Sequence, residues 1–249
     1  LFSCVSNPGK IKRPRVITSI SPDNKNIQYI GRWDLTEKNI PRADWSGVKI
    51  RATFTGKFIS LLLEDGNADY IVYIDGSEYK RLVTVEGQTS YIISNDLIGD
   101  SHEIVISRVS EYHNSPLKFR GFEISENGEL LESTPRLKNK IEFIGASWTL
   151  GYANESSTRL GTTEDVRYTT NVDKAFGSIV ADNLDAEPFF IAWGGKGMVR
   201  YYGSPKETSK EAFPAYYNRT ISGKDSEWDF SSWHPDYIVI QLGGNDFST

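Results

Sequence analysis

The sequence lacks the features that mark several large classes of protein. It contains one cysteine, so no disulfide can form within the chain, and its three histidines show no metal-ligand spacing. No apolar run approaches the roughly 20 residues of a membrane-spanning helix. The net charge of −5 provides no basic surplus, which argues against nucleic acid as a partner. No glycine-rich run of the phosphate-binding type occurs either. These absences leave a globular chain with no sign of a metal or cofactor.

The single cysteine stands close to the start of the sequence. Leu1-Phe-Ser-Cys4 resembles the end of a bacterial lipoprotein signal, with Leu three positions before the Cys and a small residue directly before it. We expect Cys4 to carry a lipid that anchors a secreted protein at the cell surface, in the periplasm or outside the cell. We interpret residues 1–26, which are polar and contain three prolines, as a signal remnant and tether.

Residues 27–134 have the alternating pattern of β-strands. Short apolar-polar runs are separated by turn residues about every eight to twelve positions, and no helical period is present. One run stops at Asp75-Gly76, a strong hairpin signal. The pattern predicts an all-β sandwich whose strands lie at 48–54, 58–63, 70–74, 81–85, 90–93, 102–107 and 118–124.

Residues 135–249 follow a different pattern. Near-continuous apolar runs at 140–144, 188–193 and 236–242 each end in glycine-containing turns, and residues 171–184 between the first two have helical spacing. Buried parallel strands read as continuous apolar runs, and helices connect them. The sequence therefore predicts an α/β domain with a parallel sheet, whose ligand crevice lies at the carboxyl ends of the strands.

Each of the three strand ends offers a group suited to acyl transfer. Ser147 follows the first strand, Gly194-Gly-Lys-Gly197 follows the second, and Asn245 follows the third. A serine hydroxyl can attack a carbonyl, while glycine amides and an Asn side chain can donate to the oxyanion that forms. Each signal has a simpler explanation, since a serine there is commonly a helix N-cap and Gly and Asn are common in turns. Their occurrence in order at three successive strand ends is more specific.

These turns resemble those of the SGNH (GDSL) hydrolases, and the whole stretch from about Ile30 onwards resembles carbohydrate esterase family 2. The stretches that carry the resemblance are Asp69-Tyr-Ile-Val-Tyr-Ile-Asp-Gly76, Gly121-Phe-Glu123, Ile141-Glu-Phe-Ile-Gly145 and Trp233-His-Pro-Asp-Tyr-Ile-Val-Ile-Gln-Leu-Gly-Gly-Asn-Asp246. The resemblance implies an N-terminal jelly-roll β-sandwich (27–134) followed by a flavodoxin-like, three-layer SGNH domain (135–249). It also implies removal of O-acetyl groups from plant-type polysaccharides such as xylan and glucomannan, through an acyl-enzyme and without a cofactor.

The same resemblance assigns roles to individual residues. It implies that Ser147 is the nucleophile and that its own amide, the Gly195 amide and the Asn245 side chain form the oxyanion hole. Gly197 is a weaker candidate for the second donor. We expect Trp148, Arg200 and Tyr201 to contact an acetylated polysaccharide or oligosaccharide or to form the wall of the cleft. Lys196 is expected to point to solvent.

Two departures from the family pattern bear on activity. Ala146 replaces the Asp of Gly-Asp-Ser, so other groups must order the serine turn. The family's general-base histidine lies in a late Asp-x-x-His segment, and none of the three histidines is a credible substitute. We expect His102 and His113 at the surface or an edge of the sandwich, and His234 at the opposite edge of the sheet from Ser147.

The missing base and the small number of α/β strands suggest an incomplete SGNH domain, which we expect to continue for roughly 80 to 120 residues. Two other functions remain open. One is a carbohydrate-binding relative that has lost catalysis, favoured by Ala146 and by the aromatic loop after Met198. The other is an O-acetyltransferase that passes the acetyl group to a sugar instead of to water.

Overall fold

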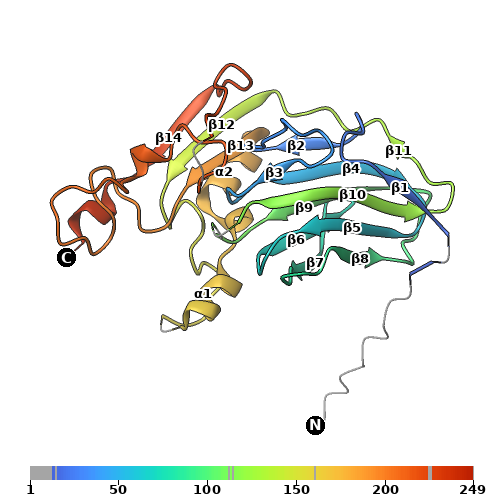
Figure 1. The fold of residues 1–249 in the computed structure, drawn as a ribbon, viewed down its shortest axis with the longest axis horizontal. Coiled ribbons are helices and arrows are strands. Elements are labelled where there is room, and N and C mark those ends of the chain that lie inside the picture. Colours follow the sequence, from blue (N-terminus) through green and yellow to red (C-terminus); the bar gives the residue numbers. More distant parts are fainter. Residues whose placement is uncertain are drawn as a thin grey trace, which may run out of the picture.

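The computed structural model describes residues 13–14, 16–111, 113, 115–159, 161–223 and 226–248. Cys4 lies outside this part of the chain. The described residues are mostly β-sheet with few helices (Figure 1). The first eleven strands are β1 (Ile17–Ile20), β2 (Gln28–Ile30), β3 (Arg42–Ala43), β4 (Lys49–Thr55), β5 (Ile59–Glu64), β6 (Asp69–Ile74), β7 (Ser77–Val83), β8 (Ser90–Ser94), β9 (Ser101–Arg108), β10 (Leu117–Ser125) and β11 (Leu130–Leu131).

These strands form two antiparallel sheets. One sheet has the order β1-β10-β5-β8, with β3 also paired to β10, and the other has the order β11-β4-β9-β6-β7, with β2 also paired to β4. Strand β4 buries every second residue, as the alternation in the sequence predicts. The seven strands expected from the sequence are all present, with ends that differ by a few residues.

The prediction that residues 1–26 form a tether is wrong for β1. Ile17 to Ile20 pair antiparallel with β10, in register with Ser125 to Phe122. The strand is only four residues long and Pro22 follows soon after it, so no alternation long enough to identify a strand was available. Three further strands, β2, β3 and β11, are shorter still, with two or three residues each, and were also not predicted.

The remaining strands form a parallel sheet of three. They are β12 (Asn139–Gly145), β13 (Ala186–Ala192) and β14 (Tyr237–Gln241), and β12 lies in the middle. Gly145 is in register with Ala192 of β13 and with Gln241 of β14. The carboxyl ends of all three strands therefore meet at one edge, as the sequence predicts.

Few helices accompany the parallel sheet. They are α1 (Thr163–Thr169), α2 (Phe176–Asn183) and the short 3₁₀ helices η1 (Val172–Lys174), η2 (Phe213–Ala215) and η3 (Gly244–Phe247). The helical spacing at 171–184 corresponds to η1 and α2. Helix α2 packs closely on the sheet at Gly177. A Cβ at this position would lie 2.7 Å from the Phe190 ring, so the close approach needs glycine. No helix in the described ranges has the length and apolar character needed to cross a membrane.

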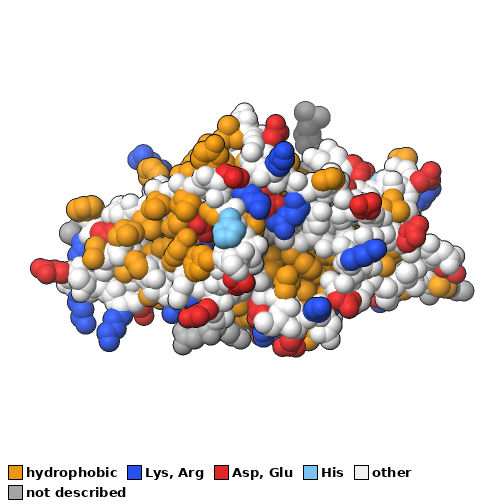
Figure 2. Space-filling view, turned by 90° about the horizontal axis from the view of Figure 1, so that it is seen from above, with side chains coloured by type: hydrophobic (Ala, Val, Ile, Leu, Met, Phe, Trp, Pro, Cys, Tyr) orange, Lys and Arg blue, Asp and Glu red, His pale blue; other side chains and the backbone are white. Residues whose placement is uncertain are grey.

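The core is continuous between the antiparallel and parallel sheets. One buried cluster extends from Ile20 in β1 through Ile144 and Ile191 of the parallel sheet to Phe213 in η2. Buried Arg32 also crosses this boundary and forms an ion pair with Glu142 in β12, with an N–O distance of 3.1 Å. By contrast, among the strands that the structure describes β14 pairs only with β12, and Tyr237, Ile238 and Ile240 are exposed. Figure 2 shows a broad group of hydrophobic side chains on the left of the face seen from above and a smaller one right of its centre.

Candidate active site

The turn that carries Ser147 is held by contacts between β12 and β14. Gly145 ends β12, and a Cβ at this position would lie 1.8 Å from the Thr149 hydroxyl oxygen, so the close fold of the turn requires glycine. The buried Thr149 hydroxyl donates to Oε1 of Gln241 at 3.1 Å. Thr149 and Gln241 thus tie the serine turn to the strand that leads to Asn245. We infer that this pair supplies part of the order lost with Ala146.

Ser147 is half-buried, and its hydroxyl has no hydrogen-bond partner among the described residues. Its backbone carbonyl accepts from the Tyr152 amide at 3.0 Å, which closes the turn behind it. The hydroxyl therefore lies at the carboxyl end of the sheet, and none of the described residues forms a hydrogen bond with it. Such a group can meet a substrate, but it needs a base to become a strong nucleophile.

Ser147 and Asn245 line one cavity. Its volume is about 300 Å³, and its walls are Ala146, Ser147, Trp148, Gln241, Leu242, Gly243, Gly244 and Asn245. Nδ2 of Asn245 donates to the Lys196 carbonyl at 2.9 Å. Because the amide carries two hydrogens, one can fix the side chain while the other remains for a ligand. Trp148 is 79% exposed, and its ring is accessible beside the serine.

The glycine turn after β13 approaches the serine turn from the other side. The Trp193 amide donates to the Gly145 carbonyl at 3.2 Å, so the two turns start from adjacent positions. Gly195 has φ +75°, and no described residue accepts from its amide. Gly197 differs, because its amide donates to the Arg200 carbonyl at 2.8 Å. Gly195 does not line the 300 Å³ cavity, so the oxyanion role of its amide stays a prediction.

The expectation that Lys196 points to solvent is wrong. Its side chain is 11% exposed, and its ammonium group lies 5.0 Å from the Trp193 ring centre and 4.6 Å from that of Tyr216. It also contacts the Tyr216 hydroxyl at 3.3 Å. Flat rings attract a cation over their faces, and the lysine stem is apolar, so this burial is favourable.

Arg200 does not line the 300 Å³ cavity, so its contact with a ligand stays a prediction. Its guanidinium donates to the backbone carbonyls of Asp246 at 2.6 Å and Ser248 at 2.9 Å. Arg200 therefore holds the loop after β13 to η3, the segment that contains Asn245. Tyr201, which forms a β-bridge with Lys196, is 37% exposed, so its ring remains accessible.

Asp246 is a site residue that the sequence did not identify. Its Oδ1 accepts from the amides of Val199 and Arg200, and its Oδ2 accepts from the Met198 amide, all at 2.8 Å. Burial alone would raise the pKa of Asp246, but these three amides and the Arg200 charge hold it below its ordinary value. The signal available in the sequence was an acidic residue directly after the Asn at a strand end.

None of the three histidines can act as the base in this structure. His234 lies before β14, at the end of the sheet opposite to Ser147, as predicted. The prediction that His102 lies at the surface or an edge of the sandwich is wrong: it is 4% exposed, in β9 between β4 and β6, and its Nδ1 lies 2.7 Å from Oδ2 of Asp75. His113 is also largely buried, between Ser222 and Glu111. The described residues contain no group of three potential metal ligands.

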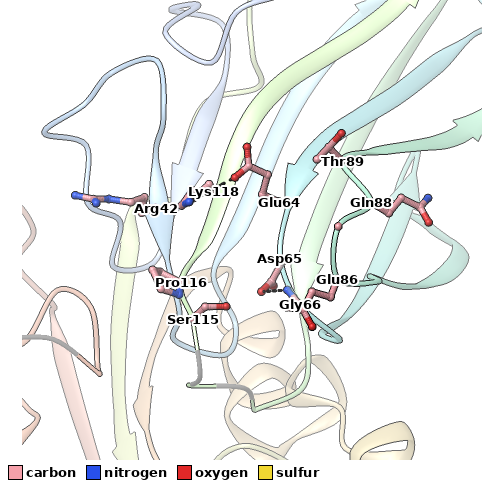
Figure 3. Close-up of a pocket in the computed structure, with 11 residues that line it drawn as sticks. Arg42, Glu64, Asp65, Gly66, Glu86, Gln88, Thr89, Ser115, Pro116 and Lys118 are labelled. Carbon is pink, nitrogen blue, oxygen red and sulfur yellow. Dashed lines mark hydrogen bonds and ion pairs between the residues drawn. The ribbon is translucent and has the colours of Figure 1, made fainter.

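A larger cavity, of about 580 Å³, lies on the antiparallel sheets and away from Ser147 (Figure 3). Its lining is polar and charged, and none of the eleven residues drawn is aromatic. Lys118 and Arg120 in β10 both pair with Glu64, which neutralises charge at its rim. We assign no ligand to this cavity, because four of its charged groups already have partners: Lys118 pairs with Glu64, Arg42 with Asp34 and Asp65 with Arg108.

Comparison with known proteins identifies relatives along most of the chain. The family model described as carbohydrate esterase 2 N-terminal matches residues 29–134. The cellulase/esterase CelE of Acetivibrio thermocellus is 34% identical over 233 residues, which are 91% of this chain and 27% of that protein. An acetylxylan esterase / glucomannan deacetylase of Cellvibrio japonicus is 31% identical over 207 residues, which are 82% of this chain and 56% of that protein.

A solved structure agrees with these matches. It is a family two carbohydrate esterase from Clostridium thermocellum in complex with cellohexaose, with a TM-score of 0.81 and 30% identity. The match covers 90% of this chain and 67% of that one. The chain thus spans about half or less of the two curated relatives and two thirds of the solved chain.

Proposed function

Since the chain belongs to carbohydrate esterase family 2, we propose that it is part of an esterase that removes O-acetyl groups from plant-type polysaccharides such as xylan and glucomannan. The observation that carries the proposal is the shared cavity of Ser147 and Asn245. A nucleophile and an oxyanion donor in one cavity are the minimum that acyl transfer requires. An exposed Trp148 beside them supplies a flat apolar surface on which a sugar ring can stack.

The proposal includes the domain organisation. In it, residues 27–134 form the jelly-roll domain, to which we add β1, and residues 135–249 form part of the SGNH domain. The antiparallel sheets of β1–β11 and the parallel order β13-β12-β14 support this division.

In the proposed reaction, the Ser147 hydroxyl attacks the acetyl carbonyl carbon and passes its proton to a base. The free hydrogen of the Asn245 amide and the Gly195 amide donate to the oxyanion of the tetrahedral intermediate. Each such donor contributes roughly 10² to 10³ in rate. Collapse of the intermediate releases the sugar hydroxyl, and water then hydrolyses the acetyl-serine through a second tetrahedral intermediate.

The base is the part of the reaction that the described residues do not provide. We assign it to a histidine of the Asp-x-x-His type in the full-length protein. The relatives that this chain matches are longer than the chain, which is consistent with that assignment.

A Ser147→Ala substitution in the full-length protein tests the proposal. We expect the unsubstituted protein to release acetate from aryl acetates and from acetylated xylan or glucomannan, measured by enzymatic acetate assay. The variant should lose at least about 10³-fold in kcat, because Ser147 carries the one hydroxyl among the described residues that line the 300 Å³ cavity. Absence of acetate release from the unsubstituted protein, or equal rates for both proteins, would overturn the proposal.

Polysaccharide binding without hydrolysis is the second candidate function, favoured by the exposed Trp148 and by a relative whose structure contains cellohexaose. Affinity electrophoresis on glucans and mannans separates the two. Retardation of a protein that releases no acetate would favour binding, and loss of retardation in Trp148→Ala would place the ligand at this cavity.

We also propose that Cys4 carries a lipid and keeps the protein at the bacterial cell surface. Full-length protein produced in cells supplied with labelled palmitate should incorporate the label, and a Cys4→Ser variant should not. Equal labelling of both would reject the anchor at Cys4.

A further inference from the structure

A carboxylate from the β-rich part of the chain reaches the glycine turn of the candidate active site. Glu111 follows β9 by three residues, and its Oε1 accepts from the Gly194 amide at 2.6 Å. A Cβ at position 194 would lie 2.5 Å from Oε2 of the same carboxylate. Glycine is therefore required at 194 for this approach, whereas the sequence alone indicated only a turn.

Glu111 is itself held by a chain of buried polar contacts. Nε2 of His113 lies 3.1 Å from the same Oε1, and its Nδ1 lies 2.6 Å from Oγ of Ser222. The Ser222 hydroxyl donates to Oδ2 of Asp44 at 2.7 Å, so it must accept from Nδ1. Nε2 on the other side of the ring faces the Glu111 carboxylate, so the imidazole links Glu111 to Ser222.

The histidine also packs against the strand that carries the turn. The His113 ring stacks on Trp193 with a centroid separation of 3.9 Å and an interplanar angle of 22°. Trp193 precedes Gly194 directly. The strand end is thus fixed by a ring stack and by a hydrogen bond to a carboxylate whose side chain is only 20% exposed.

These contacts determine which amide of the turn remains available. The Gly194 amide donates to Glu111 and the Gly197 amide donates to Arg200, but the Gly195 amide donates to no described residue. We propose that Glu111 is a positioning residue, supplied by the β-rich part, that fixes the Trp193–Gly194 peptide and thereby orients the next peptide so that the Gly195 amide can donate to the oxyanion. The inference rests on the proposed function for the identity of that oxyanion.

Glu111→Ala and Glu111→Gln variants of the full-length protein test the inference. Loss of the acceptor lets the turn move, and a displacement of about 1 Å at a catalytic group can cost 10²-fold in rate. We expect Glu111→Ala to lower kcat for an aryl acetate by about 10- to 100-fold with KM changed less than about twofold. Glu111→Gln keeps an oxygen that can accept from the Gly194 amide, so its kcat should stay within about threefold.

Glu164→Ala is the matched control. Glu164 and Glu111 line the same cavity of about 500 Å³, but among the described residues no hydrogen bond or ion pair joins the Glu164 carboxylate to the glycine turn. Its kcat and KM should be unchanged. Unchanged kcat in Glu111→Ala, or equal loss in Glu111→Ala and Glu111→Gln, would overturn the inference.

A readout without catalysis separates this inference from the proposed function. The amide ¹H–¹⁵N signals of Gly194 and Gly195 should shift in Glu111→Ala and remain in place in Glu164→Ala. If the unsubstituted protein releases no acetate, the proposed function fails, while these signals still report on the turn. Gly194 and Gly195 signals that do not move in Glu111→Ala would show that the carboxylate does not set the turn.

Discussion

At the scale of single residues, Asp246 is the clearest case of a side chain whose role is to place another. Its carboxylate accepts hydrogen bonds from three successive amides of the loop after β13. Asn245 directly precedes it in the chain, so these bonds also fix the position of Asn245. An Asp246→Asn substitution turns one acceptor into a donor that faces a backbone amide. We expect it to lower the free energy of unfolding by about 1–3 kcal/mol, measured by urea denaturation at pH 7.

The pH dependence of this effect has a defined sign. The pKa of Asp246 in the folded protein is below its ordinary value. The ionised carboxylate therefore contributes stability that is present above the ordinary pKa and is lost as the pH falls through the lower, folded value. The difference between Asp246→Asn and the unsubstituted protein should shrink in acid. The exposed Asp100→Asn serves as a control, and a difference that grows in acid would contradict this assignment.

The same scale shows why only part of the site could be predicted. Ser147 and Asn245 could be located because parallel strands end at one edge, and a residue just after each strand must lie there. Glu111 could not be located in the same way. It comes from a loop after an antiparallel strand, and nothing in its neighbourhood in the sequence indicates that it meets Gly194. Lys196 was placed wrongly because one of its two ring partners, Tyr216, is twenty residues away and could not be assigned to it from the sequence.

At the scale of elements, length decided what the sequence could reveal. Strands of five or more residues show enough alternation, or a long enough apolar run, to be recognised, and all of these were predicted. Helix α1 was not, since it has no buried residue and hence no apolar stripe. It begins with a capping box between Thr162 and Asp165, which is a local signal without a hydrophobic period. In this chain, the pattern of buried apolar residues predicts more of the secondary structure than local propensity does.

At the scale of the whole molecule, the contacts of Arg32 predict that the antiparallel sheets and the parallel sheet unfold together. Its guanidinium pairs with Glu142 and donates to the carbonyls of Tyr217 and Arg219, and the Tyr217 hydroxyl donates to Glu142 at 3.0 Å. Burial lowers the pKa of Arg32, and the negative charge of Glu142 partly offsets this. Each of the two buried charges is therefore stabilised by the other.

An Arg32→Met variant tests this coupling. It leaves the Glu142 carboxylate buried without its cation, and removing one partner of a buried pair costs about 3–5 kcal/mol. We expect urea unfolding of the full-length variant to show this loss whether it is followed at a reporter in the antiparallel sheets or at one in the parallel sheet. The double variant Arg32→Met/Glu142→Met should recover much of the loss, since it removes the unpaired charge as well. Separate transitions for the two reporters, with only one displaced by Arg32→Met, would mean that the two parts fold independently despite their shared core.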